Sequence, residues 1–97
     1  MAFTVKTTMT AGTPSSPWVQ ITDEVIRIRI SAGEVLVEVA DDANGANRGT
    51  ISNEAPTSAT GTFRAPVREY IAAETGAFYR LCAVSDGAAG DLSSGVM

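Results

Sequence analysis

Residues 25–40 constrain the fold more than any other part of this chain, because their pattern is typical of two β-strands. Isoleucine alternates with arginine from Ile26 to Ile30, and valine recurs at every second position from Val35 to Val39. Successive side chains of a β-strand lie on opposite faces, so this alternation buries the branched side chains and leaves the charged ones on the other face. The stretch therefore predicts a mostly β protein.

The two strands of this stretch are separated by a few small residues. Gly33 lies among them, and glycine readily adopts the positive φ that tight turns need. The sequence therefore predicts a β-hairpin. In such a hairpin Arg27 and Arg29 would lie opposite Glu38 and form a cross-strand ladder of charges.

Other short segments with the composition of strands follow at close spacing. We predict further strands over 2–9, 18–21 and 77–84, with loops over 11–17, 41–49 and 53–61. Pro66 divides the segment 62–73, which we expect to be extended with a bend, although a short helix over 67–74 also fits the pattern. Short strands with turns between them imply an all-β fold, a small antiparallel β-sandwich or barrel with long loops.

The length of 97 residues suits one domain, and we predict a single β domain over 1–97. Residues 1–10 are expected to form an N-terminal arm or an edge strand. Residues 86–97 are rich in Gly, Ser and Ala without periodicity, so we expect a flexible C-terminal arm there, frayed or docked on a neighbour. A core of this size is marginal for an isolated domain, so we expect neighbouring subunits to add stability.

The charge of the chain limits the class of partner. The formal net charge is −4, and six of the seven basic residues are arginine. Nucleic acid requires a concentrated cationic surface, whereas arginine forms bidentate contacts with carboxylates and is enriched where proteins meet. We therefore expect a protein partner and no nucleic acid. The sequence shows no secretory signal and no apolar run near the roughly 20 residues that cross a membrane, so we expect synthesis in the cytoplasm and no membrane partner.

Residues that usually carry catalysis or hold metals are scarce. There is no histidine, and we expect the single cysteine, Cys82, to be a small buried apolar group in a strand rather than a reactive thiol. Asp41, Asp42, Asn44 and Asn47 offer oxygen atoms to a calcium ion, but their spacing does not fit a calcium-binding loop, and a solvated acidic turn is the simpler interpretation. We expect no enzyme activity, no catalytic residue, no cofactor and no metal.

Two further features have both a structural and a functional interpretation. Trp18 follows a proline at the start of a strand, where it either fills the core or stands exposed as an interface anchor. Arg64 and Arg68 lie four residues apart near Glu69, and we expect a surface ion pair among them, because a site for an anion or a nucleic acid would need more basic residues than this chain has. Within the strand 77–84, Arg80 interrupts an apolar face, so we expect it to lie near the strand start or to have a carboxylate partner.

Three pieces of the chain follow one another in a recognisable order: Trp18-Val-Gln-Ile21, the strands of 25–40 followed by Asp41-Asp42, and a closing strand with Phe78-Tyr-Arg80. This order resembles a loose class of small virion proteins of tailed bacteriophages, and the resemblance covers roughly residues 18–84. Members of that class are similar to capsid decoration (cement) proteins or to small tail and fibre components. The resemblance implies a structural role and supplies no active-site residue.

The leading hypothesis is a non-enzymatic phage structural protein that binds the outer capsid surface and stabilises the shell. It implies the major capsid protein as partner and the virion as the final location. We expect a homotrimer, because local three-fold positions are common docking points on capsids. The expected interface comprises the N-terminal strand, Trp18 and the loops near 41–61, with Phe3, Val5, Trp18, Asp41, Asp42, Asn44, Asn47, Arg48 and Arg64 as its residues.

Two alternatives remain open from the sequence. The domain could instead be a phage tail, neck or fibre component that acts as an adaptor or contacts the host. A module that binds or hydrolyses carbohydrate is the third hypothesis, with Trp18, Tyr70 or Tyr79 as the platform for a sugar ring.

Overall fold

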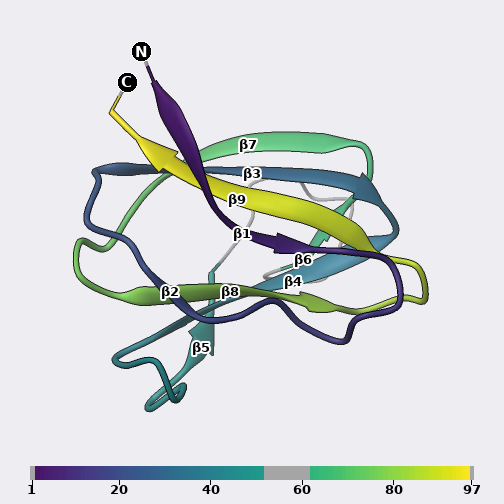
Figure 1. The fold of residues 1–97 in the computed structure, drawn as a ribbon, viewed down its shortest axis with the longest axis horizontal. Coiled ribbons are helices and arrows are strands. Elements are labelled where there is room, and N and C mark those ends of the chain that lie inside the picture. The colour runs from purple at the N-terminus through teal and green to yellow at the C-terminus, as the bar shows by residue number, and fades with distance from the viewer. Residues whose placement is uncertain (1, 52–61, 97) are drawn as a thin grey trace.

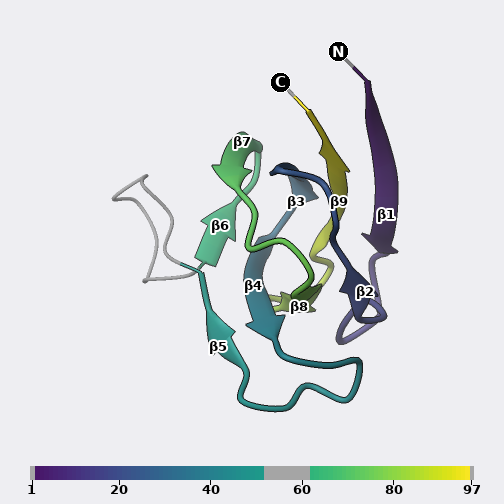
Figure 2. The same ribbon diagram turned by 90° about the vertical axis from the view of Figure 1, so that its left-hand side faces the viewer.

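The computed structural model describes residues 2–51 and 62–96, which form two antiparallel β-sheets packed against each other (Figure 1 and Figure 2). Sheet A has the strand order β1 (Phe3–Met9), β9 (Ala89–Gly95), β3 (Val25–Ala32) and β7 (Val67–Ala72). Sheet B has the order β2 (Val19–Gln20), β8 (Phe78–Ala83), β4 (Glu34–Ala40) and β5 (Gly49–Thr50), and β6 (Thr62–Arg64) also pairs with β4. The fold is therefore a small β-sandwich, as the sequence predicts.

The core lies between the two sheets. The isoleucines of β3 and alternate valines of β4 are its centre, and none of their side chains is more than 2% exposed. Side chains from four further strands, β1, β6, β8 and β9, and Ile21 from the connection between β2 and β3 complete it. The most buried apolar residues are Met9, Ile21, Ile26, Ile28, Ile30, Val35, Val37, Phe63, Leu81, Ala88 and Leu92. The alternation thus correctly predicts the burial of Ile26, Ile28, Ile30, Val35 and Val37, but it is wrong at the end of β4, where Val39 is only partly buried and Ala40 is buried.

The pairing predicted for 25–40 is wrong, because β3 and β4 belong to different sheets. The chain turns a corner at Gly33, whose φ is 68°. A Cβ atom at this position would lie 2.8 Å from the Cα of Ala88, so the corner requires glycine for space as well as for conformation. The alternation cannot distinguish the two arrangements, because a strand buries one face whether its neighbour in sequence lies beside it or across the core.

This corner also removes the predicted ladder of charges. Arg29 forms its ion pair with Asp91 on β9, in sheet A. Glu38 forms its ion pair with Arg80 on β8, in sheet B. Arg29 and Glu38 thus each form an ion pair within their own sheet, whereas Arg27 donates a hydrogen bond to the hydroxyl of Ser93. Arg80 has the carboxylate neighbour that its position predicts.

The C-terminal segment differs most from expectation. Residues 86–97, expected to form a flexible arm, include β9, which lies between β1 and β3 in the middle of sheet A (Figure 1). Ser93 and Ser94 are at most 1% exposed, and glycines occupy positions 90 and 95. Small residues replace the usual apolar alternation here, which is why no periodicity is visible. β1, by contrast, is an edge strand of sheet A, and an edge strand is one of the two possibilities predicted for residues 1–10.

The segment 62–73 is extended with a bend, as predicted. β6 belongs to sheet B and β7 to sheet A, and the chain passes between them at the cis peptide bond Ala65–Pro66. β7 is an edge strand, which fits a segment that begins at a proline. The loop predicted over 53–61 lies outside the described residues.

Candidate functional site

The surface of sheet A that points away from the core gathers arginine side chains from two neighbouring strands. Arg27 lies opposite Tyr70 on β7, and Arg29 lies opposite Arg68 on the same strand. On the other side of β3, these two arginines lie opposite Ser93 and Asp91 of β9. We call this surface the outer face of sheet A. Its three arginines and one aspartate leave a positive surface on a protein whose net charge is −4.

An aromatic cluster occupies one end of this face. The rings of Phe3 and Tyr70 meet edge to face with their centroids 5.5 Å apart, and the guanidinium of Arg27 lies 5.3 Å from the Phe3 centroid. The cross-strand partner of Phe3 is Gly95, where a Cβ would lie 3.1 Å from Cγ of Phe3, so the aromatic ring packs close to the backbone of β9. Tyr70 is 41% exposed, so the cluster presents an aromatic surface to solvent.

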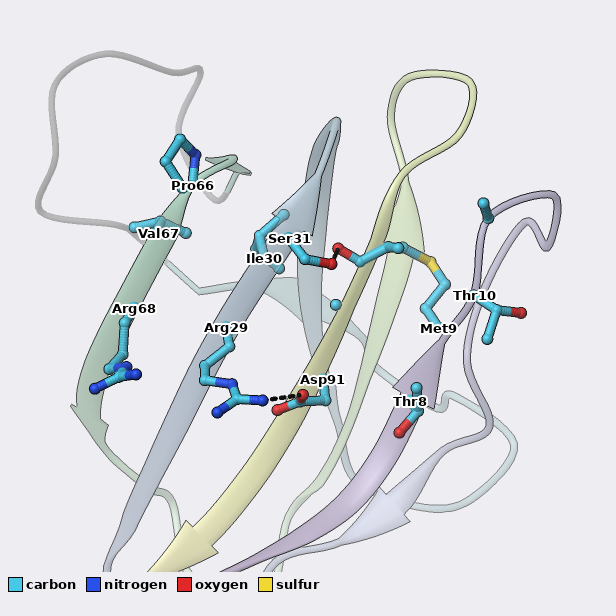
Figure 3. A pocket seen from close by; sticks show the side chains of 13 residues that line it. Thr8, Met9, Thr10, Arg29, Ile30, Ser31, Pro66, Val67, Arg68 and Asp91 are labelled. Carbon is cyan, nitrogen blue, oxygen red and sulfur yellow. Dashed lines mark hydrogen bonds and ion pairs between the residues drawn. The ribbon is translucent and has the colours of Figure 1, made fainter.

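A groove occupies the other end of the outer face (Figure 3). It crosses all four strands of sheet A and has a volume of about 680 Å³. Thr8 and Thr10 line it on the side of β1, and Pro66 and Arg68 line it on the side of β7. Between these walls, Nη2 of Arg29 lies 3.2 Å from Oδ2 of Asp91.

Two polar atoms of the outer face are buried without a hydrogen-bond partner among the described residues. They are Nε of Arg27 and Oδ1 of Asp91. An unpaired buried polar atom costs about 1–3 kcal/mol, so proteins keep few of them, and those kept need a specific explanation. Their concentration on the outer face of sheet A marks this surface as one that is not optimised for the isolated fold.

The outer face of sheet B carries a different kind of arginine site. Nε of Arg80 donates a hydrogen bond of 2.7 Å to Oε1 of Glu38, and Sγ of Cys82 donates to the same oxygen at 3.3 Å. The guanidinium of Arg80 also lies 4.5 Å from the ring centroid of Trp18. Gly45 packs against the same ring system, since a Cβ at this position would lie 3.1 Å from Cζ2 of Trp18. Trp18 therefore belongs to a packed surface cluster. It neither fills the core nor stands exposed as an interface anchor.

The environment of this cluster shifts two pKa values. Burial alone would raise the pKa of Glu38, but hydrogen bonds from Arg80 and Cys82 and the charges of Arg80 and Arg48 outweigh it, so the pKa lies below its usual 4.5. Burial, together with the hydrogen bond to Glu38, raises the pKa of Cys82 to about 11. The thiol is only half-buried, yet it stays protonated at neutral pH and is therefore a poor nucleophile.

The polar side chains of the loop 41–48 form hydrogen bonds with backbone and side-chain groups of the same loop. Oδ1 of Asp42 accepts hydrogen bonds from the backbone N–H groups of Asn44 and Ala46, at 2.8 and 3.1 Å. Nδ2 of Asn47 donates to Oδ2 of Asp41 at 2.8 Å, with Asn47 at a φ of 53°. These contacts fit the interpretation as an acidic turn. Within residues 2–51 and 62–96, no three acidic, histidine or cysteine side chains are grouped to hold a metal ion.

The predicted interface residues do not form one surface. Phe3 and Val5 belong to β1 in sheet A, whereas Trp18 and the loop 41–48 pack beside sheet B. Arg64 lies 3.9 Å from Glu34 on the neighbouring strand, so the ion pair expected with Glu69 is wrong.

Of the three proposed sugar platforms, Tyr79 is excluded by its burial. The side chain is 3% exposed, and its hydroxyl oxygen accepts a hydrogen bond from the N–H of Glu74. Burial is also the main reason why the pKa of Tyr79 is raised. Tyr70 is the platform candidate with an exposed ring.

Comparison of the chain with protein-family models, curated protein sequences and solved structures finds no significant match. None of the described segments is a helix long and apolar enough to span a membrane. The outer face of sheet A, with its aromatic cluster and its groove, is therefore the candidate site on the strength of its own residues.

Proposed function

We propose that this protein is a non-enzymatic structural protein of a phage virion, which binds the outer surface of the capsid and stabilises the shell. The outer face of sheet A is the observation that carries the proposal. It presents exposed aromatic, aliphatic and arginine side chains on a four-stranded sheet, and aromatic residues and arginine are enriched at the centres of protein interfaces. The resemblance of residues 18–84 to small phage virion proteins supplies the capsid as the partner.

The stabilisation follows from binding equilibria. A protein that binds the assembled shell, and not its dissociated or unfolded subunits, shifts the equilibrium toward the shell. At a free concentration about 100 times Kd, the gain is about 2.7 kcal/mol per site. A homotrimer at a local three-fold position would contact several capsid subunits at once, and the resulting avidity would exceed the affinity of one copy.

Binding to purified phage heads that lack this protein tests the proposal. Co-sedimentation measures binding, quantitative mass spectrometry gives the number of copies per capsid subunit, and a thermal melt measures the shell. We expect a copy number approaching that of the capsid subunit and a higher melting temperature. Binding confined to tails would favour the tail, neck or fibre alternative, and binding to neither would refute a virion role.

Two valines provide a matched pair of variants for this experiment. Val5 on β1 is 50% exposed, and Val84, just beyond β8 of sheet B, is 51% exposed. We expect Val5→Ser to weaken binding to heads and Val84→Ser to leave it unchanged, because only Val5 lies in sheet A. Equal effects of the two substitutions would show that the outer face of sheet A is not the contact surface.

A further inference from the structure

The groove on the outer face of sheet A contains an electrostatic conflict. Arg29 and Arg68 are direct cross-strand partners on β3 and β7, and like charges in this position destabilise a sheet. Asp91 pairs with Arg29, but no described residue provides a carboxylate partner for Arg68. Glu69, next to it in sequence, lies opposite Ile28 and so has the parity of the inward-facing positions. A negative group bound in the groove would remove this conflict.

The groove also restricts what kind of molecule brings that charge. Its walls combine the hydroxyl groups of Thr8, Thr10 and Ser31 with apolar surface from Pro66 and Ala89, and none of its lining residues is aromatic. Sugar rings and nucleic-acid bases bind proteins largely by stacking on aromatic rings. A peptide needs no such platform, because its carboxylate side chains bind arginine and its small side chains fill apolar recesses.

We propose that this groove binds a short, extended, acidic segment of a partner protein, with an aspartate or glutamate side chain held between Arg29 and Arg68. Within residues 2–51 and 62–96 the planar guanidinium of Arg68 has no ion-pair partner, so it can form two parallel hydrogen bonds with that carboxylate. Arg29 keeps its ion pair with Asp91 and also attracts the bound carboxylate electrostatically (Figure 3). A volume of about 680 Å³ accommodates a few residues of the segment.

The assignment of this segment to the capsid surface rests on the proposed function, whereas the peptide binding does not. Binding of the peptide and binding to phage heads are therefore tested in separate experiments. Peptide binding without binding to heads would refute the virion role and keep the groove as a peptide site. Binding to heads that is unaffected by substitution of Arg68 would keep the virion role and refute the groove as its contact.

The direct test uses peptides of about eight residues that alternate glutamate with alanine, and control peptides with glutamine in place of glutamate. Fluorescence anisotropy gives the affinity, and NMR chemical shifts locate the site. We expect the acidic peptide to bind more tightly than the control, to shift the amide signals of Ser31 and Ala89, and to weaken severalfold from about 50 to about 300 mM salt. Equal affinity for both peptides, or no binding, would overturn the proposal.

Two arginine variants sharpen this test. Arg68→Ala should weaken the acidic peptide about tenfold, because it removes a charge-assisted hydrogen bond. Arg64→Ala removes another exposed arginine, from β6 in sheet B, and should have no effect. A similar loss in both variants would indicate nonspecific attraction. Binding of an acidic oligosaccharide but not of the peptide would make the groove a glycan site and refute the proposed ligand.

Discussion

The two outer faces of the sandwich use arginine in opposite ways. On sheet B, Arg80 has a carboxylate at 2.7 Å and an aromatic ring at 4.5 Å, and the neighbouring thiol bonds to the same carboxylate. On sheet A, Arg68 has no acidic partner among the described residues, and Nε of Arg27 is buried without a hydrogen bond. Arg80, whose contacts are complete, stabilises the fold, whereas Arg68, which is exposed and has no ion pair with a described residue, is available to a partner.

The largest expected effect that tests this contrast concerns Cys82. With a pKa raised to about 11, its thiolate fraction at neutral or mildly alkaline pH is small. We expect iodoacetamide to label it about 100-fold more slowly at about pH 8 than it labels an unperturbed thiol of a short peptide. Glu38→Gln should accelerate labelling, because the carboxylate contributes to the raised pKa. A rate equal to that of the peptide would show that the cluster on sheet B is open in solution.

The next effect is on stability. Arg80→Ala should lower the free energy of unfolding by about 2 kcal/mol, because it leaves the half-buried carboxylate of Glu38 without its main partner. Arg29→Ala should cost less, about 1 kcal/mol, because the side chain of Arg29 is 46% exposed whereas that of Arg80 is 21% exposed. Urea denaturation monitored by tryptophan fluorescence measures both variants. Equal losses would contradict the distinction between the two faces.

The acid sensitivity of the cluster gives a third prediction. The pKa of Glu38 is lower in the folded protein than its usual 4.5, so its ionised form stabilises the fold. This contribution is present above the pKa of the unfolded chain and is lost as the pH falls through the lower folded pKa. Denaturation between about pH 6 and about pH 3 should therefore show a smaller loss of stability in Glu38→Gln than in the unsubstituted protein. Identical pH profiles would contradict the shift.

The smallest effect has the opposite sign. Arg68→Gln should leave stability unchanged or raise it by a few tenths of a kcal/mol, because it removes the repulsion from Arg29 across the β3–β7 pair. Arg64→Gln removes an exposed ion pair and should cost a few tenths of a kcal/mol. Thermal denaturation at low salt, where the repulsion is strongest, compares the two. A clear loss of stability in Arg68→Gln would mean that this arginine is part of the fold's own interactions.

The sequence predicts strands better than it predicts their partners. The alternation over 25–40 correctly indicates two strands and most of their buried residues, because parity depends only on neighbours in sequence, although Ala40 is buried where Val39 is expected to be. It cannot indicate that Gly33 turns the chain from one sheet to the other, since that depends on Ala88 and on packing across the core. β9 is not predicted from the sequence, because serine and glycine occupy buried positions where a strand usually has apolar residues.

The candidate site could be foreseen only in part. Phe3 and Val5 are among the predicted interface residues, and both lie on β1, the edge strand of sheet A. The meeting of Arg29 with Arg68 could not be predicted, because it depends on the register of two strands about 40 residues apart. No local pattern carries that register.

The position of β9 has a consequence for the order in which the protein is made and folds. Among the described strands, β9 is the last to leave the ribosome, yet it supplies the hydrogen bonds that join β1 to β3. While β9 is still being synthesised, the first strand has no neighbour in its own sheet. Sheet A is therefore completed only after translation has passed residue 95, and a nascent chain presents the edges of β1 and β3 to chaperones until that moment.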